Sequence, residues 1–196
     1  MRQLAAGGEL ARRQEAVLAL CRLADEAEGR RDMLSLKVSA PLCGMLQAGA
    51  AASLQVPAAT ALSKLAAASQ PAREAIRAAG AIPLLASLLD SGNRDGSEAA
   101  LGTLSSAALD RDCQKALLAA GVVKRLPAFL EPSASEPARR AAAALLRNLT
   151  AYDGCGKALC AEPGLLQAAG QLLAADSEAV QLCCAWAMHN LVRSAI

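Results

Sequence analysis

Leucine or alanine recurs every 42 residues in this chain of 196 residues. Similar four-residue segments end at these positions, such as Leu62-Ser63-Lys64-Leu65 and Met188-His189-Asn190-Leu191. We call the recurring positions the grid: Leu23, Leu65, Ala107, Leu149 and Leu191. A fixed period of this length is typical of stacked supersecondary units, each of which buries its apolar faces against its neighbours. The period therefore predicts a repeat array rather than one globular core.

The stretch from 53 to 93 shows the content of one repeat most clearly. Apolar residues at helical spacing predict a helix over 55–67. Pro71 opens a shorter helix over 72–79, because proline is well tolerated in a first helical turn. Gly80 ends that helix by adopting positive φ, and the next helix begins at 81. Gly121 and Gly164 mark the same junction in later repeats, so each repeat should hold two short helices and a longer third.

Glycines elsewhere are expected in the turns between repeats, at 7–8 and 92–96, where they would supply positive φ. No segment alternates apolar and polar residues with β-branched side chains, so no strand is predicted.

Composition limits the class of protein. The chain has 49 alanines but one Trp, one Tyr and one Phe, so its core is built from Ala and Leu. No uncharged apolar stretch is long enough to span a membrane, and the first residues do not resemble a secretory signal. The net charge is +2, and the basic pairs are scattered among acids, which argues against a nucleic-acid interface.

The cysteine pattern indicates free thiols. There are seven cysteines, an odd number, with no Cys-x-x-Cys. Most fall at apolar helix positions, where Cys acts as a small hydrophobe, and a reducing intracellular compartment, cytoplasmic or nuclear, fits best. No set with metal-ligand spacing exists, so no metal is expected. The cysteines are Cys21, Cys43, Cys113, Cys155, Cys160, Cys183 and Cys184.

Enzymatic constellations are also lacking in the sequence. The one histidine, His189, lies in one of the recurring four-residue segments, and no Gly-rich loop follows a strand. Acidic pairs such as Asp110 and Asp112 fall at helix starts, where they suit the helix dipole. We therefore expect neither catalysis nor a cofactor.

The helix pattern resembles the armadillo repeat family, to which β-catenin, plakophilins and importin alpha belong. Residues 80–89, Gly-Ala-Ile-Pro-Leu-Leu-Ala-Ser-Leu-Leu, followed by 99–104, carry the resemblance most clearly. It implies an all-α, right-handed α-solenoid over 1–196. HEAT repeats are the structural rival, but their units usually hold two long helices. We expect one array with units at about 9–50, 51–92, 93–134 and 135–175 and a partial unit at 176–196.

Both ends look cut. Leu4 and Gly8 align with Leu88 and Gly92, so the chain is expected to open near the end of a second helix. Neither end resembles the polar cap that usually closes a solenoid. We expect a fragment of a longer protein, or apolar ends that promote end-to-end self-association.

The resemblance also implies a ligand-binding groove along the third helices. In the family, Asn at the position before the grid residue hydrogen-bonds an extended ligand, and in importin alpha a Trp lies four residues earlier. We expect Asn148 and Asn190 to be partly accessible on the concave surface with Trp186, although a core position for Trp186 is an open alternative. The candidate groove residues are Arg22, Lys64, Ser106, Asn148, Trp186 and Asn190.

The character of the ligand follows from charge. Arg22 and Lys64, with Arg13 and Arg139 nearby, would make the groove positive and favour an acidic peptide. Neighbouring acids such as Glu15 are an equal alternative, since they would cancel this charge. The sequence therefore predicts a protein-interaction scaffold that binds a peptide segment. The alternative is a structural armadillo segment of a larger protein, such as a ubiquitin ligase, with no groove of its own.

Overall fold

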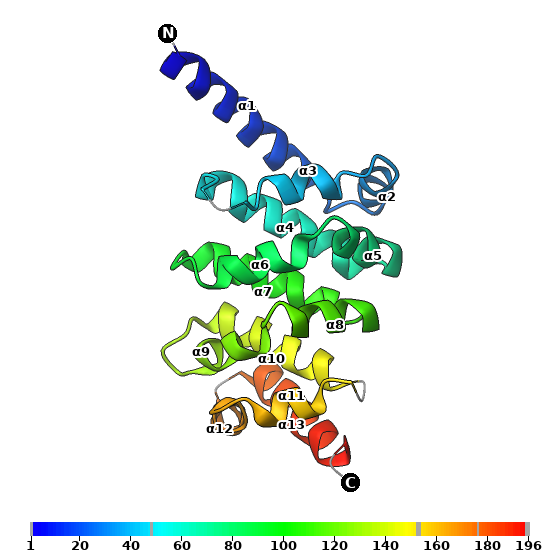
Figure 1. Ribbon diagram of the computed structural model, residues 1–196, viewed down its shortest axis with the longest axis vertical. Coiled ribbons are helices and arrows are strands. Elements are labelled where there is room, and N and C mark those ends of the chain that lie inside the picture. Colours follow the sequence, from blue (N-terminus) through cyan, green and yellow to red (C-terminus); the bar gives the residue numbers. More distant parts are fainter. Residues whose placement is uncertain (1, 48, 152–153, 176, 195–196) are drawn as a thin grey trace. The chain divides into compact units, whose positions relative to one another are not determined.

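A computed structural model describes residues 2–47, 49–151, 154–175 and 177–194. Within these ranges every regular element is a helix and no strand occurs, as predicted. Long helices recur at the repeat period (Figure 1). They are α1 (Arg2–Leu23), α4 (Ala52–Ala68), α7 (Arg94–Ala107), α10 (Glu136–Thr150) and α13 (Glu178–Ser194).

Shorter helices fill the space between successive long ones. They are α2 (Ala27–Ser35), α3 (Ser39–Gly44), α5 (Gln70–Ala78), α6 (Ala81–Leu89), α8 (Arg111–Ala119), η1 (Val123–Arg125), α9 (Leu126–Leu130), α11 (Gly156–Ala161), α12 (Leu165–Gln171) and η2 (Leu172–Ala174). The predicted alternation of two short segments and one long helix is confirmed. The chain is an all-α solenoid.

The chain divides into two compact units, Met1–Thr103 and Leu104–Ile196, at a boundary within α7. In the first unit α1 packs on α4, and α4 also contacts α3 and α5. In the second unit α10 packs on α13, and α12 contacts both α9 and α13. Each unit therefore contains a pair of long helices in direct contact.

Alanine lets these long helices approach closely. Ala58 and Ala59 on α4 and Ala142 and Ala143 on α10 are fully buried. Four of the five grid residues are also in the core: Leu65, Ala107, Leu149 and Leu191 are at most 5% exposed. Because burying a leucine side chain contributes roughly 1.5–3 kcal/mol, the grid is the main apolar register of the stack.

Leu23 is the exception on the grid, because it is 38% exposed. It is the last residue of α1, and it lies against Gly29 of α2. A Cβ at Gly29 would collide with the Leu23 backbone and side chain, so α2 meets the end of α1 only because Gly29 has no side chain. Leu23 thus covers a short helix rather than the next long one.

The junction between the two short helices needs a left-handed residue. Gly80, Gly121 and Gly164 have φ values of 73°, 67° and 77°, as the sequence predicts. In the first repeat Lys37 takes this conformation instead, with φ 53°. The Val38 amide donates to the Met33 carbonyl at 3.0 Å, just as the Val122 amide donates to the Leu117 carbonyl at 3.1 Å. Lys37 therefore occupies the glycine position of a helix C-cap.

The turn expected at 7–8 is helical instead, and the turn expected at 92–96 ends earlier, because helix begins at Arg94. Gly7 and Gly8 lie inside α1, and Gly96 lies in the first turn of α7. Gly92 does adopt positive φ, and Asn93 after it caps α7 by accepting the Gly96 amide at 3.1 Å. Gly8 is followed by Glu9-Leu10-Ala11, which are good helix formers without a cap, so the chain continues as helix. The expectation that the chain opens near the end of a second helix was wrong for this reason.

We predict that Leu65→Ala and Leu149→Ala each lower the free energy of unfolding by about 2–5 kcal/mol, because each leaves a cavity in a close-packed core. Urea denaturation followed by circular dichroism measures this loss. Leu36→Ala is the control, since Leu36 is 74% exposed and its truncation should cost under about 0.5 kcal/mol. Equal losses at all three positions would contradict the grid register.

We predict that Lys37→Gly raises the free energy of unfolding by about 0.5–1.5 kcal/mol, because a side chain at positive φ is strained. Thermal unfolding checks the sign. Lys115→Gly in α8 is the matched control, since the same change inside a helix should destabilise by about 1 kcal/mol. A lower melting temperature for Lys37→Gly would disprove the strain.

Candidate functional site

The candidate groove residues all lie on long helices, Trp186 at the middle of α13 and the others in the second half, but their exposure differs. Arg22 is exposed, and Ser106 and Asn190 are partly exposed. Trp186 is 58% exposed, so it is not a core residue. Lys64 is partly buried and Asn148 is only 7% exposed. The expectation of accessible amides is thus met by Asn190 and is wrong for Asn148.

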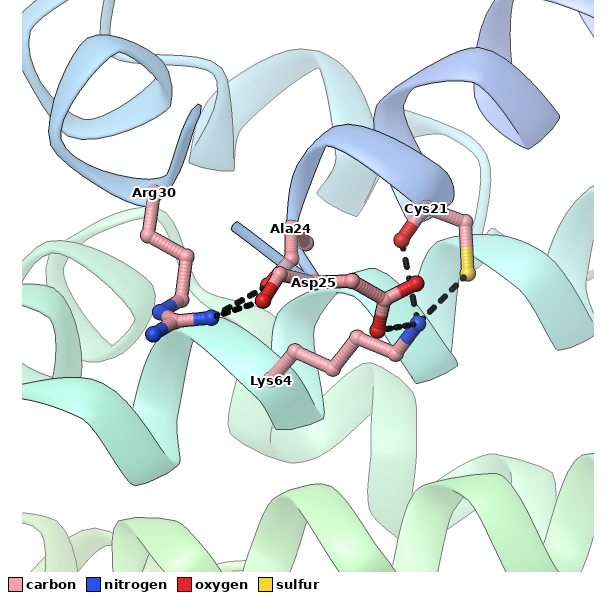
Figure 2. A network of polar contacts seen from close by, with 5 residues as sticks. All are labelled: Cys21, Ala24, Asp25, Arg30 and Lys64. Atoms are coloured by element: carbon pink, nitrogen blue, oxygen red, sulfur yellow. Dashed lines mark hydrogen bonds and ion pairs between the residues drawn. The ribbon is translucent and has the colours of Figure 1, made fainter. Parts of the chain in front are cut away.

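Lys64 is held by three acceptors around the end of α1 (Figure 2). Its Nζ lies 2.6 Å from the Asp25 carboxylate, 3.0 Å from the Cys21 carbonyl oxygen and 3.7 Å from Cys21 Sγ. The hydrogen bond to Asp25 is the main cause that raises the Lys64 pKa above its usual value. The Asp25 backbone is fixed in turn by Arg30, whose Nη1 donates to the carbonyls of Ala24 and Asp25 at 2.8 Å. Lys64 therefore ties α4 to α1.

Asn148 makes the equivalent contact in the second unit. Its Nδ2 donates to the Ser105 carbonyl oxygen at 2.8 Å, 43 residues earlier, and Lys64 likewise reaches back 43 residues to Cys21. Its Oδ1 accepts from Arg147 at 3.1 Å. Buried Gln114 donates at 3.0 Å to the Asn148 carbonyl. Asn148 thus ties α10 to α7, with its amide already paired.

Asn190 reaches the preceding helix through a hydroxyl. Its Nδ2 is 3.4 Å from Thr150 Oγ1, and that hydroxyl donates to the Arg147 carbonyl at 2.8 Å. The Arg147 carbonyl stands at the same repeat position as those of Cys21 and Ser105, two residues before the grid. We call these contacts the clasp: each joins a residue just before the grid to the preceding long helix.

The clasp supplies hydrogen-bond donors to backbone carbonyls at the ends of the long helices. The last carbonyls of a helix have no partner within it. In a continuing α-helix, the amides four residues later, those of Asp25 and Leu109, would donate to the Cys21 and Ser105 carbonyls. Here the Asp25 amide donates to the Arg22 carbonyl at 3.0 Å instead, and the Leu109 amide donates to the Ser106 carbonyl at 3.3 Å. Lys64 and Asn148 supply the missing donors. This role could not be predicted from residue types, because the acceptors are backbone atoms.

A shallow, open hollow lies on α13. Leu182, Ala185, Trp186 and His189 line a volume of about 290 Å³. The Trp186 and His189 rings meet edge to face, with centroids 6.1 Å apart. The opposite face of α13 holds the core residues Val180, Cys184, Ala187 and Leu191. The hollow and Asn190 therefore share one accessible part of α13, and the assignment of this surface to a concave groove stays a prediction.

Of the other basic residues considered, Arg13 is exposed, but Arg139 on α10 is engaged by the loop that precedes this helix. Arg139 Nη1 donates to the carbonyls of Pro132 and Ala134 at 2.8 and 2.7 Å. It therefore stabilises the turn before α10, so the expectation that it lines the groove was wrong. With Lys64 paired to Asp25, two of the four residues that suggested a positive groove are internally satisfied.

Other chemistry finds little support in the described residues. They contain no group of three or more His, Cys, Asp or Glu residues that could hold a metal ion. None of their helices is both long and apolar enough to cross a membrane. All seven cysteines are free, five of them buried; Cys160 is exposed and Cys21 is partly exposed.

Comparison with known proteins identifies the repeat. Residues 69–108 and 110–151 match the family model described as Armadillo/beta-catenin-like repeat. Each matched range spans two short helical segments followed by a long helix, here α5 to α7 and α8 to α10. No curated protein matches the chain.

Solved structures of similar fold include several designed proteins. The designed armadillo repeat protein YIII(Dq)4CqI has a TM-score of 0.85 at 24% identity, over 91% of this chain and 75% of that chain. A designed armadillo repeat protein in complex with peptide (KR)4 has a TM-score of 0.81 at 22% identity, over 90% and 74%. Computationally designed armadillo repeat proteins for modular peptide recognition have a TM-score of 0.83 at 24% identity, over 90% and 74%.

We predict that Asn148→Ala lowers the free energy of unfolding by about 1–3 kcal/mol, because it leaves the Ser105 carbonyl buried without a donor. Asn190→Ala should cost less than about 1 kcal/mol, since Asn190 is partly exposed and its contact is long. Chemical denaturation of both variants measures the difference. Losses under about 0.5 kcal/mol for both would show that the clasp is not structural.

Proposed function

The chain is an armadillo repeat protein, and on this premise we propose that it binds an extended acidic peptide segment of a partner protein on the long helices of its second unit. The coarser conclusion, a repeat scaffold for protein interaction, follows from the family match and from designed relatives made for peptide recognition. Scaffolds of this fold are generally non-enzymatic. The observation that carries the finer proposal is the exposed Trp186 hollow, on a helix that packs against a basic neighbour.

The hollow offers an anchor for an apolar side chain. Trp186 and Leu182 are 58% and 53% exposed, which is unusual for large apolar residues on one helix face. Tryptophan is enriched among the residues that dominate binding energy, particularly at pockets that exclude water. Asn190, one turn from Trp186, offers an amide that can both donate to and accept from a peptide backbone.

Charge favours an acidic ligand. Exposed Arg140 and Arg147 on α10 stand 42 residues before Leu182 and His189 of the hollow. The only acidic residues of α10 and α13 are their first residues, Glu136 and Glu178. Complementary charge speeds encounter and rejects wrong partners. The designed relative that was solved with peptide (KR)4 has a basic ligand, and we propose the opposite preference here.

The first unit is a weaker candidate for this role. Lys64 is already paired with Asp25, and Arg22 is then the remaining candidate groove residue on α1 and α4. We further propose that the partner is met inside the cell, cytoplasmic or nuclear, which is supported by seven free thiols.

A second candidate function is purely structural, and the outer face of α13 favours it. Ala185 and Val192 are exposed, whereas Ala143 and Thr150, 42 residues earlier on α10, are buried. Since α13 packs on α10, a further helix could cover α13 in the same way. This helix would come from another repeat or from a second copy of the chain joined end to end. Sedimentation over a concentration series tests the second source.

We predict that a labelled acidic peptide with one central leucine binds the protein, and that the emission of Trp186 shifts to shorter wavelength as the ring loses water. Trp186 is the single tryptophan, so the emission reports on this site alone. Fluorescence anisotropy of the label gives the affinity. Trp186→Ala should weaken binding by about 10-fold or more, as expected for an aromatic anchor.

Charge reversal supplies the control. Arg147→Glu should weaken binding by about 10-fold, whereas Arg31→Glu, the same change at an exposed position of α2 in the first unit, should leave it unchanged. Added salt should weaken binding of the acidic peptide. Equal binding of a lysine-containing version of the peptide, or no effect of Arg147→Glu, would contradict the proposal.

A further inference from the structure

Cys21 and Lys64 form a contact that the clasp alone does not explain. Lys64 Nζ lies 3.7 Å from Cys21 Sγ while it donates to the carbonyl of the same residue (Figure 2). The two side chains come from different long helices, α1 and α4, which pack together. A thiol and a primary amine are thus held side by side across two neighbouring repeats.

The environment of Cys21 differs from that of the core cysteines. Cys21 is partly exposed, so a small oxidant can reach it. Burial raises the pKa of the Cys43 and Cys184 thiols to about 11, which keeps them protonated and unreactive.

We propose that Cys21 and Lys64 form a reversible covalent bridge under oxidising conditions, in which one oxygen atom joins Sγ to Nζ. The gap of 3.7 Å favours a bridge with one inserted atom over a direct bond between sulfur and nitrogen. The bridge is a modification site of the first unit and does not depend on the ligand site proposed on α10 and α13.

The atoms and electrons balance with molecular oxygen as the oxidant. The thiol loses its hydrogen and the neutral amine loses one hydrogen. The O–O bond breaks, one oxygen forms bonds to sulfur and nitrogen, and the other leaves as water with both hydrogens. Sulfur and nitrogen each give up two electrons, and oxygen takes up four. Two molecules of a dithiol reductant, each oxidised to its disulfide, together supply the four electrons and four protons that restore the thiol, the amine and one water.

Asp25 has a defined part in this chemistry. Lys64 is an ammonium group at rest and must lose a proton before its nitrogen can form a new bond. The Asp25 carboxylate oxygen lies 2.6 Å from Nζ, so it stabilises the resting ammonium form and is also a base within reach of the proton that Nζ loses as the new bond forms. Arg30 fixes the Asp25 backbone, so the acceptor is held in position.

The bridge would have a structural consequence. It would close a loop between residues 43 apart and would link α1 to α4 covalently. A crosslink of this kind stabilises chiefly by restricting the unfolded chain. It would also remove the positive charge of Lys64 and leave Asp25 exposed to other partners. Oxidation would therefore rigidify the first unit and make its surface more acidic.

Intact-mass measurement of the full chain tests the proposal directly. After exposure to air-saturated buffer or dilute hydrogen peroxide, we expect a species about 14 Da heavier, which is one oxygen gained and two hydrogens lost, unlike the roughly 16 Da of a sulfenic acid or methionine sulfoxide. Peptide mapping should join the segments that contain Cys21 and Lys64. Dithiothreitol should reverse the change, and the bridged species should melt about 5 °C or more above the reduced one.

Three variants separate the bridge from other oxidation. Cys21→Ser and Lys64→Arg should lack the joined peptides, and Lys64→Arg keeps the charge, so a loss there points to the amine. Cys160→Ser removes the exposed thiol and should leave the bridge intact. Oxidation of Cys21 in the wild-type chain to sulfinic acid without joined peptides would overturn the proposal. So would an unchanged mass gain of about 14 Da in Lys64→Arg.

Discussion

The structure depends on satisfying a few backbone carbonyls at the ends of its long helices. The Cys21, Ser105 and Arg147 carbonyls lie in the last turn of α1, α7 and α10, where helices lack internal donors. Lys64 and Asn148 on the following long helix donate to the first two, and Thr150, bonded to Asn190, donates to the third. A buried carbonyl without a donor costs about 1–3 kcal/mol, so the clasp fixes the register at which α4 meets α1, α10 meets α7 and α13 meets α10.

Alanine packing makes this clasp possible. Fully buried alanines such as Ala59 on α4 and Ala143 on α10 leave no bulk between neighbouring helices. The backbones are then close enough for a side chain from one helix to reach a carbonyl of another. Thr103 shows the same within the first unit, since its hydroxyl donates to the Ala59 carbonyl at 2.8 Å. Apolar packing brings the helices together, and polar contacts set their alignment.

The sequence predicted the fold well because the period records apolar packing, which depends on residue type. Leu65, Leu149 and Leu191 were placed correctly in the core for this reason. The site was predicted less well. Asn148 was expected to be accessible, and its burial could not be foreseen, because its partner is the backbone of Ser105 and any residue type presents such a carbonyl. The left-handed conformation of Lys37 was not predicted, because lysine, unlike glycine, does not indicate positive φ in a sequence.

The clasp also limits which residues of the long helices are available to bind a ligand. A polar residue before the grid that is engaged by the preceding helix, as Lys64 and Asn148 are, is not available to a ligand without a structural cost. Side chains outside the clasp carry no such cost, and Trp186, Arg140 and His189 are exposed on α10 and α13. Selection for binding can alter these positions without disturbing the stack, whereas a change at Asn148 alters both. In a solenoid built in this way, the clasp residues set the register of the long helices, and exposed residues on neighbouring helix turns set the specificity for a ligand.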